Sequence, residues 1–87
     1  MLSPTPGSTF STSNVTFHWS AGGATSYFLF VGSSPYRADI YNSGVIQTTS
    51  ATVNNIPTDG RTIYVTLGYQ VNGSWTHVNY TYTAFKQ

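Results

Sequence analysis

The dipeptide Asn72-Gly73 constrains the fold of this chain more than any other feature, because it marks the tip of a hairpin. Asn-Gly favours a two-residue type I′ turn, in which both central residues need a positive φ. Strand-like sequence flanks the dipeptide on both sides. With Val71 opposite Ser74, the ladder extends from the turn to Tyr82. The sequence therefore predicts one long antiparallel hairpin over its last quarter.

This register sorts the hairpin into two faces, because successive side chains of a strand point to opposite sides of the sheet. One face is apolar, and we expect it to face the core: Ile63, Val65, Leu67, Tyr69, Val71, Val78, Tyr80 and Tyr82. The other face mixes polar side chains with aromatic rings, and we expect it to face outward: Tyr64, Thr66, Gly68, Gln70, Trp75, His77, Asn79 and Thr81.

Turn residues punctuate the rest of the chain about every ten positions, and no segment has a long helical periodicity, a pattern typical of an all-β protein. We expect strands at residues 2–10, 14–20, 26–31 and 50–56, with short strand pieces at 40–43 and 44–47. With the two strands of the hairpin, and with the two short pieces counted as one strand, these segments predict seven antiparallel strands. The opening strand should lie at an edge, because proline is tolerated there and not in a central strand.

The predicted strand at residues 26–31 is apolar on both faces, since Tyr27 and Leu29 alternate with Phe28 and Phe30. Such a strand is central, or partly covered on its outer side. If it pairs with the first strand of the hairpin, both phenylalanines share the outward face of that hairpin.

Length and composition indicate a single small domain spanning residues 1–87. The chain has no cysteine, so neither a disulfide nor a thiolate metal site can stabilise it. Aromatic residues make up 16% of the sequence and compensate, because each buried ring removes a large area from water. Met1 directly precedes domain-like sequence without a signal peptide, so we expect a piece of a larger multidomain protein.

Charge is scarce: the net charge of +1 comes from two arginines, one lysine and two aspartates. Without a basic patch, nucleic acid is not an expected partner. No apolar run approaches the roughly 18 residues of a membrane span, so we expect no membrane insertion. Low charge combined with abundant serine and threonine is similar to exported bacterial β-domains, which predicts an extracellular location.

Three stretches carry a resemblance to a known family. Val15, Phe17 and Trp19 match a strand B pattern, Tyr27, Leu29 and Val31 match a strand C pattern, and Gly73-Ser74-Trp75 matches an F to G turn. Over nearly its whole length the chain resembles a fibronectin type III-like domain. This resemblance implies a β-sandwich, in which strand C pairs with strand F. An immunoglobulin domain fits less well, because the cysteine pair is missing.

More narrowly, the stretches 3–8, 57–61 and 80–84 resemble a bacterial variant of this family. That variant occurs as an accessory module of large secreted or surface proteins. The resemblance therefore implies neighbouring domains of a parent protein as partners.

Catalysis needs positioned acids, bases or a nucleophile, and the sequence shows no such arrangement. Its two carboxylates, Asp39 and Asp59, each stand near an arginine in turn-like sequence, which predicts local ion pairs. A glycosidase pair would require both loops to converge within roughly 5–9.5 Å. His18 and His77 fall on the outer faces of opposite sheets, so we expect no metal site, no cofactor and no enzyme.

The outward face of the hairpin is the candidate ligand-binding surface. Aromatic rings among hydroxyl and amide groups can stack on sugars, and the residues concerned are Trp75, Tyr64, His77, Asn79, Gln70, Phe28 and Phe30. Gly68 should leave a shallow place beside them. The alternative is structural: strands favour aromatics and threonine, and cross-strand pairs stabilise a hairpin. Residues 39–47 or a neighbouring domain could also cover the rings.

We therefore expect a non-catalytic accessory module that spaces or docks its neighbouring domains. Two alternatives remain open, a carbohydrate-binding module with polysaccharide as its partner and a protein-adhesion domain. An exposed Trp75 with uncovered neighbouring rings favours carbohydrate binding. A partly covered sheet without a groove favours the structural role, and self-association through the phenylalanines favours adhesion.

Overall fold

The computed structural model describes residues 2–86. These residues form no helix and six strands: β1 (Val15–His18), β2 (Ser26–Gly32), β3 (Tyr41–Asn42), β4 (Ser50–Val53), β5 (Thr62–Val71) and β6 (Ser74–Thr83). The predicted all-β class is confirmed. Since these residues form no helix, none is available to cross a membrane.

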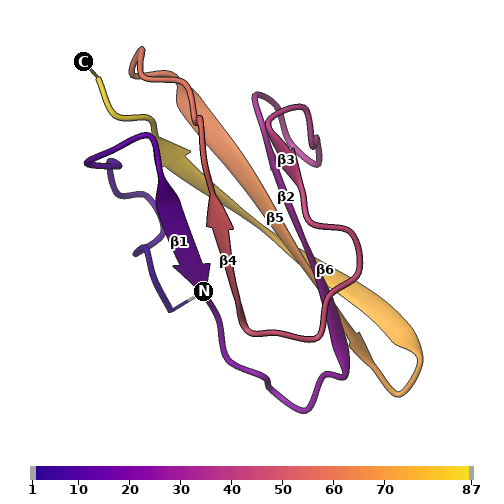
Figure 1. Cartoon of the computed structure of the whole chain (residues 1–87). Helices are drawn as coiled ribbons and strands as arrows, with labels where there is room; N and C mark the ends of the chain where they lie inside the picture. The colour runs from indigo at the N-terminus through magenta and orange to yellow at the C-terminus, as the bar shows by residue number, and fades with distance from the viewer. Residues whose placement is uncertain (1, 87) are drawn as a thin grey trace.

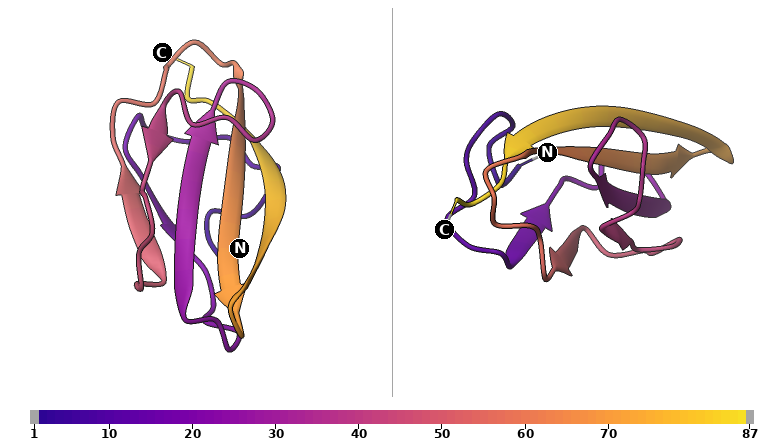
Figure 2. Two further views of the ribbon diagram at one scale, coloured as in Figure 1. Left: turned by 90° about the vertical axis from the view of Figure 1, so that its right-hand side faces the viewer. Right: turned by 90° about the horizontal axis from the view of Figure 1, so that it is seen from above.

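The six strands form two antiparallel sheets (Figure 1). β1 pairs with β4 in a two-stranded sheet, and the other sheet has the order β3-β2-β5-β6. The long β5–β6 hairpin extends past the two-stranded sheet at one end of the molecule (Figure 2). At that end the turn before β2 meets the hairpin, where the Thr25 amide donates to the Gln70 carbonyl at 2.9 Å. The larger sheet is therefore covered by strands over only part of its length.

The predicted hairpin is confirmed in both turn and register. Asn72 has φ 51° and Gly73 has φ 81°, the two positive values that a type I′ turn requires. The strands pair continuously from Val71 with Ser74 to Thr62 with Thr83. A two-residue turn fixes which residues of the two strands lie opposite each other, so it sets the register of the whole hairpin.

The count of seven strands was wrong, because residues 2–10 do not form a strand. They make two isolated bridges to different sheets, Ser3 to His18 and Thr9 to Thr83. Pro4 and Pro6 have no amide to donate to a ladder, so the segment cannot pair continuously with either sheet. Of the two pieces expected at 40–47, β3 forms, and Ile46 makes only an isolated bridge.

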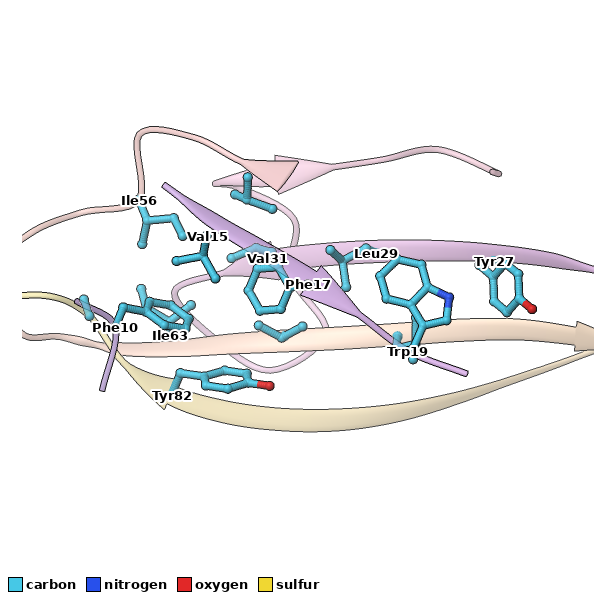
Figure 3. Packing of buried hydrophobic residues seen from close by; sticks show 14 residues of the cluster. Phe10, Val15, Phe17, Trp19, Tyr27, Leu29, Val31, Ile56, Ile63 and Tyr82 are labelled. Carbon is cyan, nitrogen blue, oxygen red and sulfur yellow. The ribbon is translucent and has the colours of Figure 1, made fainter. Parts of the chain in front are cut away.

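Both sheets contribute to one hydrophobic core, drawn in Figure 3. Its aromatic centre joins the opening segment to β1 and β6. Phe10 stacks on Tyr82 with 5.0 Å between ring centroids, and Phe17 meets both rings edge-on at 6.0 and 5.8 Å. The Tyr82 hydroxyl donates to the Pro4 carbonyl at 3.0 Å. The irregular opening segment is therefore held by packing rather than by a ladder.

The inward face predicted for the hairpin is buried only in part. Ile63, Val65, Leu67 and Tyr82 are buried, Tyr69, Val71 and Tyr80 are half-buried, and Val78 is 38% exposed. The prediction was wrong for Val78, because β6 is the edge of its sheet and the two-stranded sheet does not extend over it. Alternation decides which way a side chain points, and only the opposite layer decides whether it is covered.

Candidate functional site

The seven candidate residues of the sequence lie on one face of the four-stranded sheet, the face turned away from the core. The strand register places them there, since Phe28 lies opposite Gly68 and Gly68 lies opposite His77. β2, β5 and β6 therefore contribute side chains to a common outer surface, as the alternation predicts.

Five rings on this surface form a continuous chain of contacts. Ring centroids are 5.4 Å apart for Trp75 and Phe28, 4.5 Å for Phe28 and Phe30, and 5.9 Å for Phe30 and Tyr36. Tyr36 then meets His77 at 4.7 Å. We call these five side chains the aromatic face. Neighbouring rings are inclined by 37° to 89°, so they pack on one another and do not form a flat platform.

The shallow place expected at Gly68 is absent, and that expectation was wrong. The Phe28 ring lies directly on the Gly68 backbone, where a Cβ atom would overlap the ring. Glycine is thus required because an aromatic ring from the neighbouring strand occupies its side-chain space.

Tyr36 is the member of the aromatic face that the sequence analysis missed. It lies in the loop after β2 with φ 58°, and its ring contacts Phe30 of β2 and His77 of β6. Its ring therefore lies across β5. A lone tyrosine in a Ser-Pro-rich turn has no periodic pattern, so no sequence signal could have placed it there.

Asp39 holds this loop in place. Its two carboxylate oxygens accept hydrogen bonds from the Ser33 amide at 3.0 Å and from the Ser33 hydroxyl at 2.7 Å. These hydrogen bonds lower the pKa of the Asp39 carboxyl, with a smaller contribution from Arg37 at 3.8 Å. Asp39 thus serves to close the loop that carries Tyr36.

Thr66 is buried, although the sequence predicted it to be exposed. Thr66 lies opposite Phe30 in β2 and is only 1% exposed. Its hydroxyl donates to Oδ1 of Asn79 at 2.8 Å, so the buried group has a partner. Asn79 is therefore engaged by the sheet itself and is less available to a ligand than the sequence suggested.

Tyr64 and Gln70 lie at opposite ends of the outer surface. Gln70 pairs with Trp75 beside the turn, whereas Tyr64 pairs with Thr81 at the far end of the hairpin. Gln70 is six positions along β5 from Tyr64, a span of roughly 20 Å. A single small ligand on Trp75 would therefore not reach Tyr64.

Exposure differs between the middle and the ends of the aromatic face. Trp75 is 44% exposed and Tyr36 is 50% exposed, whereas Phe28 and Phe30 between them are half-buried. The five rings include no carboxylate, lysine or arginine. The face can therefore make apolar and stacking contacts, and its large accessible rings are those of Trp75 and Tyr36.

The second carboxylate is also paired, as the sequence predicted. Asp59 accepts from Nη2 of Arg61 at 2.7 Å and from Nε at 3.0 Å. Hydrogen bonds from Arg61 lower the pKa of Asp59 to about 2. The described residues contain no group of three or more His, Asp or Glu side chains that could hold a metal ion. His18 and His77 are exposed, on β1 and β6 respectively.

A hollow of about 310 Å³ lies on the opposite side of the hairpin, where the two-stranded sheet ends. Trp19, Tyr27, Tyr69 and Tyr80 contribute its aromatic lining. Nε1 of Trp19 is buried without a polar partner among the described residues. Its nitrogen lies on the side of the indole facing the Tyr27 ring, 5.8 Å away between centroids (Figure 3). This geometry suits an N–H to π contact.

Comparisons with known protein families, with curated proteins and with solved structures found no match to this chain.

Proposed function

We propose that this chain is a non-catalytic accessory module of an extracellular bacterial protein, which spaces or docks neighbouring domains. In this proposal the fold is a fibronectin type III-like β-sandwich. The pairing of β2 with β5 supports it, because it is the pairing of strands C and F that the family resemblance implies. The two carboxylates also fit a non-catalytic role, since each is held by its own local partners.

The packing and exposure of the aromatic face are the observations that support the docking role. Phe28 and Phe30 are half-buried by rings of the chain itself, and no hollow remains at Gly68. Trp75 and Tyr36 still leave large apolar surfaces in solvent on one side of one sheet. Surfaces of this kind are typical of contacts with another protein surface, since inclined rings fit a folded partner better than a flat ligand.

The docking role predicts that a neighbouring domain shields the aromatic face. The test compares this chain alone with the same chain joined to the segments encoded on either side of it. We expect weaker quenching of Trp75 fluorescence by acrylamide in the longer protein. A Trp75→Phe variant gives the contribution of Trp19, so that the Trp75 signal is obtained by difference. Equal quenching of Trp75 in the two proteins would refute docking through this face.

Carbohydrate binding is the second candidate function, and the exposure of Trp75 favours it. The Trp75 ring is open to solvent at the tip of the hairpin, and Gln70 lies opposite it on the same face. An indole face with an amide beside it can stack on a sugar ring and hydrogen-bond its hydroxyl groups. Protein adhesion, the third function considered, would use the same exposed rings.

Titration with soluble polysaccharides separates the two leading candidates. Carbohydrate binding predicts saturable changes in Trp75 fluorescence and in the amide resonances of Gln70 and Trp75. Trp75→Ala should abolish them, whereas Val78→Ala, a change of an exposed residue on the other face of β6, should leave them intact. A response that persists in Trp75→Ala would exclude a sugar site at Trp75.

A further inference from the structure

β6 is an edge strand that the protein leaves largely uncovered. It is the last strand in the order β3-β2-β5-β6 and is ten residues long. The opening segment covers only its final part: the Gly7 amide donates to the Thr81 carbonyl at 2.8 Å, and the Phe10 amide donates to the Thr83 carbonyl at 2.9 Å. Among the described residues, no other segment hydrogen-bonds to the outer edge of β6 at residues 74–79.

The backbone groups of this edge can be assigned from the hairpin geometry. In an antiparallel pair, alternate residues turn their amide and carbonyl to the paired strand or away from it. Thr81 and Thr83 bond outward to the opening segment, so Asn79, His77 and Trp75 also direct their amide and carbonyl outward. Among the described residues these outward backbone groups have no hydrogen-bond partner, and three successive donor–acceptor pairs therefore face solvent.

The edge also lacks the usual protection against strand pairing. Natural edge strands carry lysine, proline or bulges, or are short. β6 contains no charged residue, no proline and no glycine, and it pairs with β5 without a bulge. In addition, Trp75 on one face and Val78 on the other are large apolar side chains exposed on this strand. A strand laid against the edge would cover both.

We propose that β6 pairs with β6 of a second copy of this chain, antiparallel and centred on His77. Only residues whose amide and carbonyl point outward can form hydrogen bonds across the edge. When His77 lies opposite His77 of the second copy, all three such residues, Trp75, His77 and Asn79, form these bonds. Trp75 then lies opposite Asn79 of the second copy, and the reverse pair completes the two-fold arrangement. This register forms about six backbone hydrogen bonds, whereas a shift by two residues forms about four.

Side chains favour a second copy as the occupant of the edge. β6 contains no Asp, Glu, Lys or Arg, so two copies of it do not repel each other. For the same reason, a charged partner strand would find no side chain of opposite charge on β6. In the register centred on His77, Val78 lies beside Thr76 of the second copy on the inner face. Trp75 is covered on the outer face by the facing strand. Each copy thus supplies the other with the polar and β-branched side chains that pair well across strands.

The measurement is sedimentation velocity from about 10 µM to about 1 mM, combined with amide exchange at both ends of that range. We expect a monomer that converts to a dimer as the concentration rises. In step with it, exchange should slow at the amides of Trp75, His77 and Asn79, and not at the amide of Thr83, which donates to the Ser8 carbonyl within one copy.

Variants of His77 test the register. His77→Lys places two like charges together on the symmetry axis and should weaken dimerisation at least about tenfold. His77→Ala removes the ring contact with Tyr36 without adding charge, so it should retain the dimer. Thr81→Lys adds the same charge on the same face of β6 outside the paired segment, and it should also retain the dimer.

Three results would overturn the proposal. The first is a monomer at the highest concentration with unprotected edge amides. The second is a dimer that His77→Lys leaves intact and in which the amides of Trp75, His77 and Asn79 stay unprotected, which would assign the contact to another surface. The third is an edge that becomes protected only when the neighbouring segments of a longer chain are present.

Discussion

Gly68 is the residue on which the packing of the aromatic face depends. The Phe28 ring lies on its backbone, and Phe28 in turn contacts both Phe30 and Trp75. A side chain at position 68 would have to displace the ring, because the two cannot share the space. One methyl group can therefore disturb the order of three rings.

Gly68→Ala should lower the free energy of unfolding by about 1–3 kcal/mol through overpacking. The same change in a Phe28→Ala background should cost less than about 0.5 kcal/mol, because the displaced ring is gone. Urea denaturation of the four proteins in this cycle measures the coupling. Additive effects of the two changes would show that the Phe28 ring is not what Gly68 accommodates.

Tyr82 joins the core to the opening segment through its ring and its hydroxyl. Burial raises its pKa to about 12, with a smaller contribution from Tyr80. The unfolded chain loses this proton near pH 10, whereas the folded chain holds it to about pH 12. The contribution of Tyr82 to the free energy of unfolding should therefore be fully present below about pH 10 and decline as the pH rises towards 12.

Tyr82→Phe should reduce this alkaline decline. It also removes the hydrogen bond to the Pro4 carbonyl, so the free energy of unfolding at neutral pH should fall by about 0.5–1.5 kcal/mol. Thermal unfolding between pH 7 and 12, with tyrosinate absorbance as a second probe, measures both effects. In the variant, the remaining alkaline decline should come from Tyr80, whose pKa is also raised by burial. An identical alkaline decline in the two proteins would contradict the role of Tyr82.

The β5–β6 hairpin is the element that organises the larger sheet. Its turn sets the pairing of ten residues in each strand, and β2 then pairs along the other side of β5 from Ser26 to Gly32. The outer rings and the open edge of β6 are both consequences of this register. A change in the turn should therefore affect the whole sheet and not the tip alone.

Gly73→Ala should destabilise the protein by about 1–2 kcal/mol, because alanine is disfavoured at φ 81°. Ser74→Ala is the matched control: it places the same side chain at the next position, where the strand backbone accepts any residue. Urea denaturation compares the two. Equal stabilities would mean that the hairpin does not depend on its positive φ values.

The whole molecule contains few charges, and both of its carboxylates are exposed and locally bonded. The pKa of Asp59 is lowered to about 2 by Arg61, and that of Asp39 is lowered by Ser33. A lowered carboxyl pKa stabilises the folded chain above about pH 4, and that contribution is lost as the pH falls towards 2. With no buried carboxylate involved, the loss should be small.

Acid titration tests this balance. The melting temperature should stay nearly constant from pH 7 to about 4.5 and decline between about pH 4 and 2. Asp39→Asn and Asp59→Asn should each remove part of the decline, and the double variant should remove almost all of it. A steep transition near pH 5 or 6 would point to the histidines and contradict this account.

Of the candidate site, the sequence predicted the outer orientation of Phe28, Phe30, Trp75 and His77, because alternation and the Asn-Gly turn are local properties. It could not predict that Phe28 would fill the space at Gly68 or that Tyr36 would contact Phe30 and His77. Both depend on contacts between segments that no periodic pattern links. The separation of Tyr64 from Trp75 followed from the register, since five strand residues lie between Tyr64 and Gln70, the partner of Trp75.

The sequence by itself determined the all-β class, the type I′ turn and the hairpin register, because each rests on backbone preferences of a few adjacent residues. Only the tertiary structure decided how many segments pair as strands, where the opening prolines lie, and that Val78 and the edge of β6 remain open to solvent. Burial and edge exposure depend on how far the second sheet extends over the first, and that extent is a property of the packed layers.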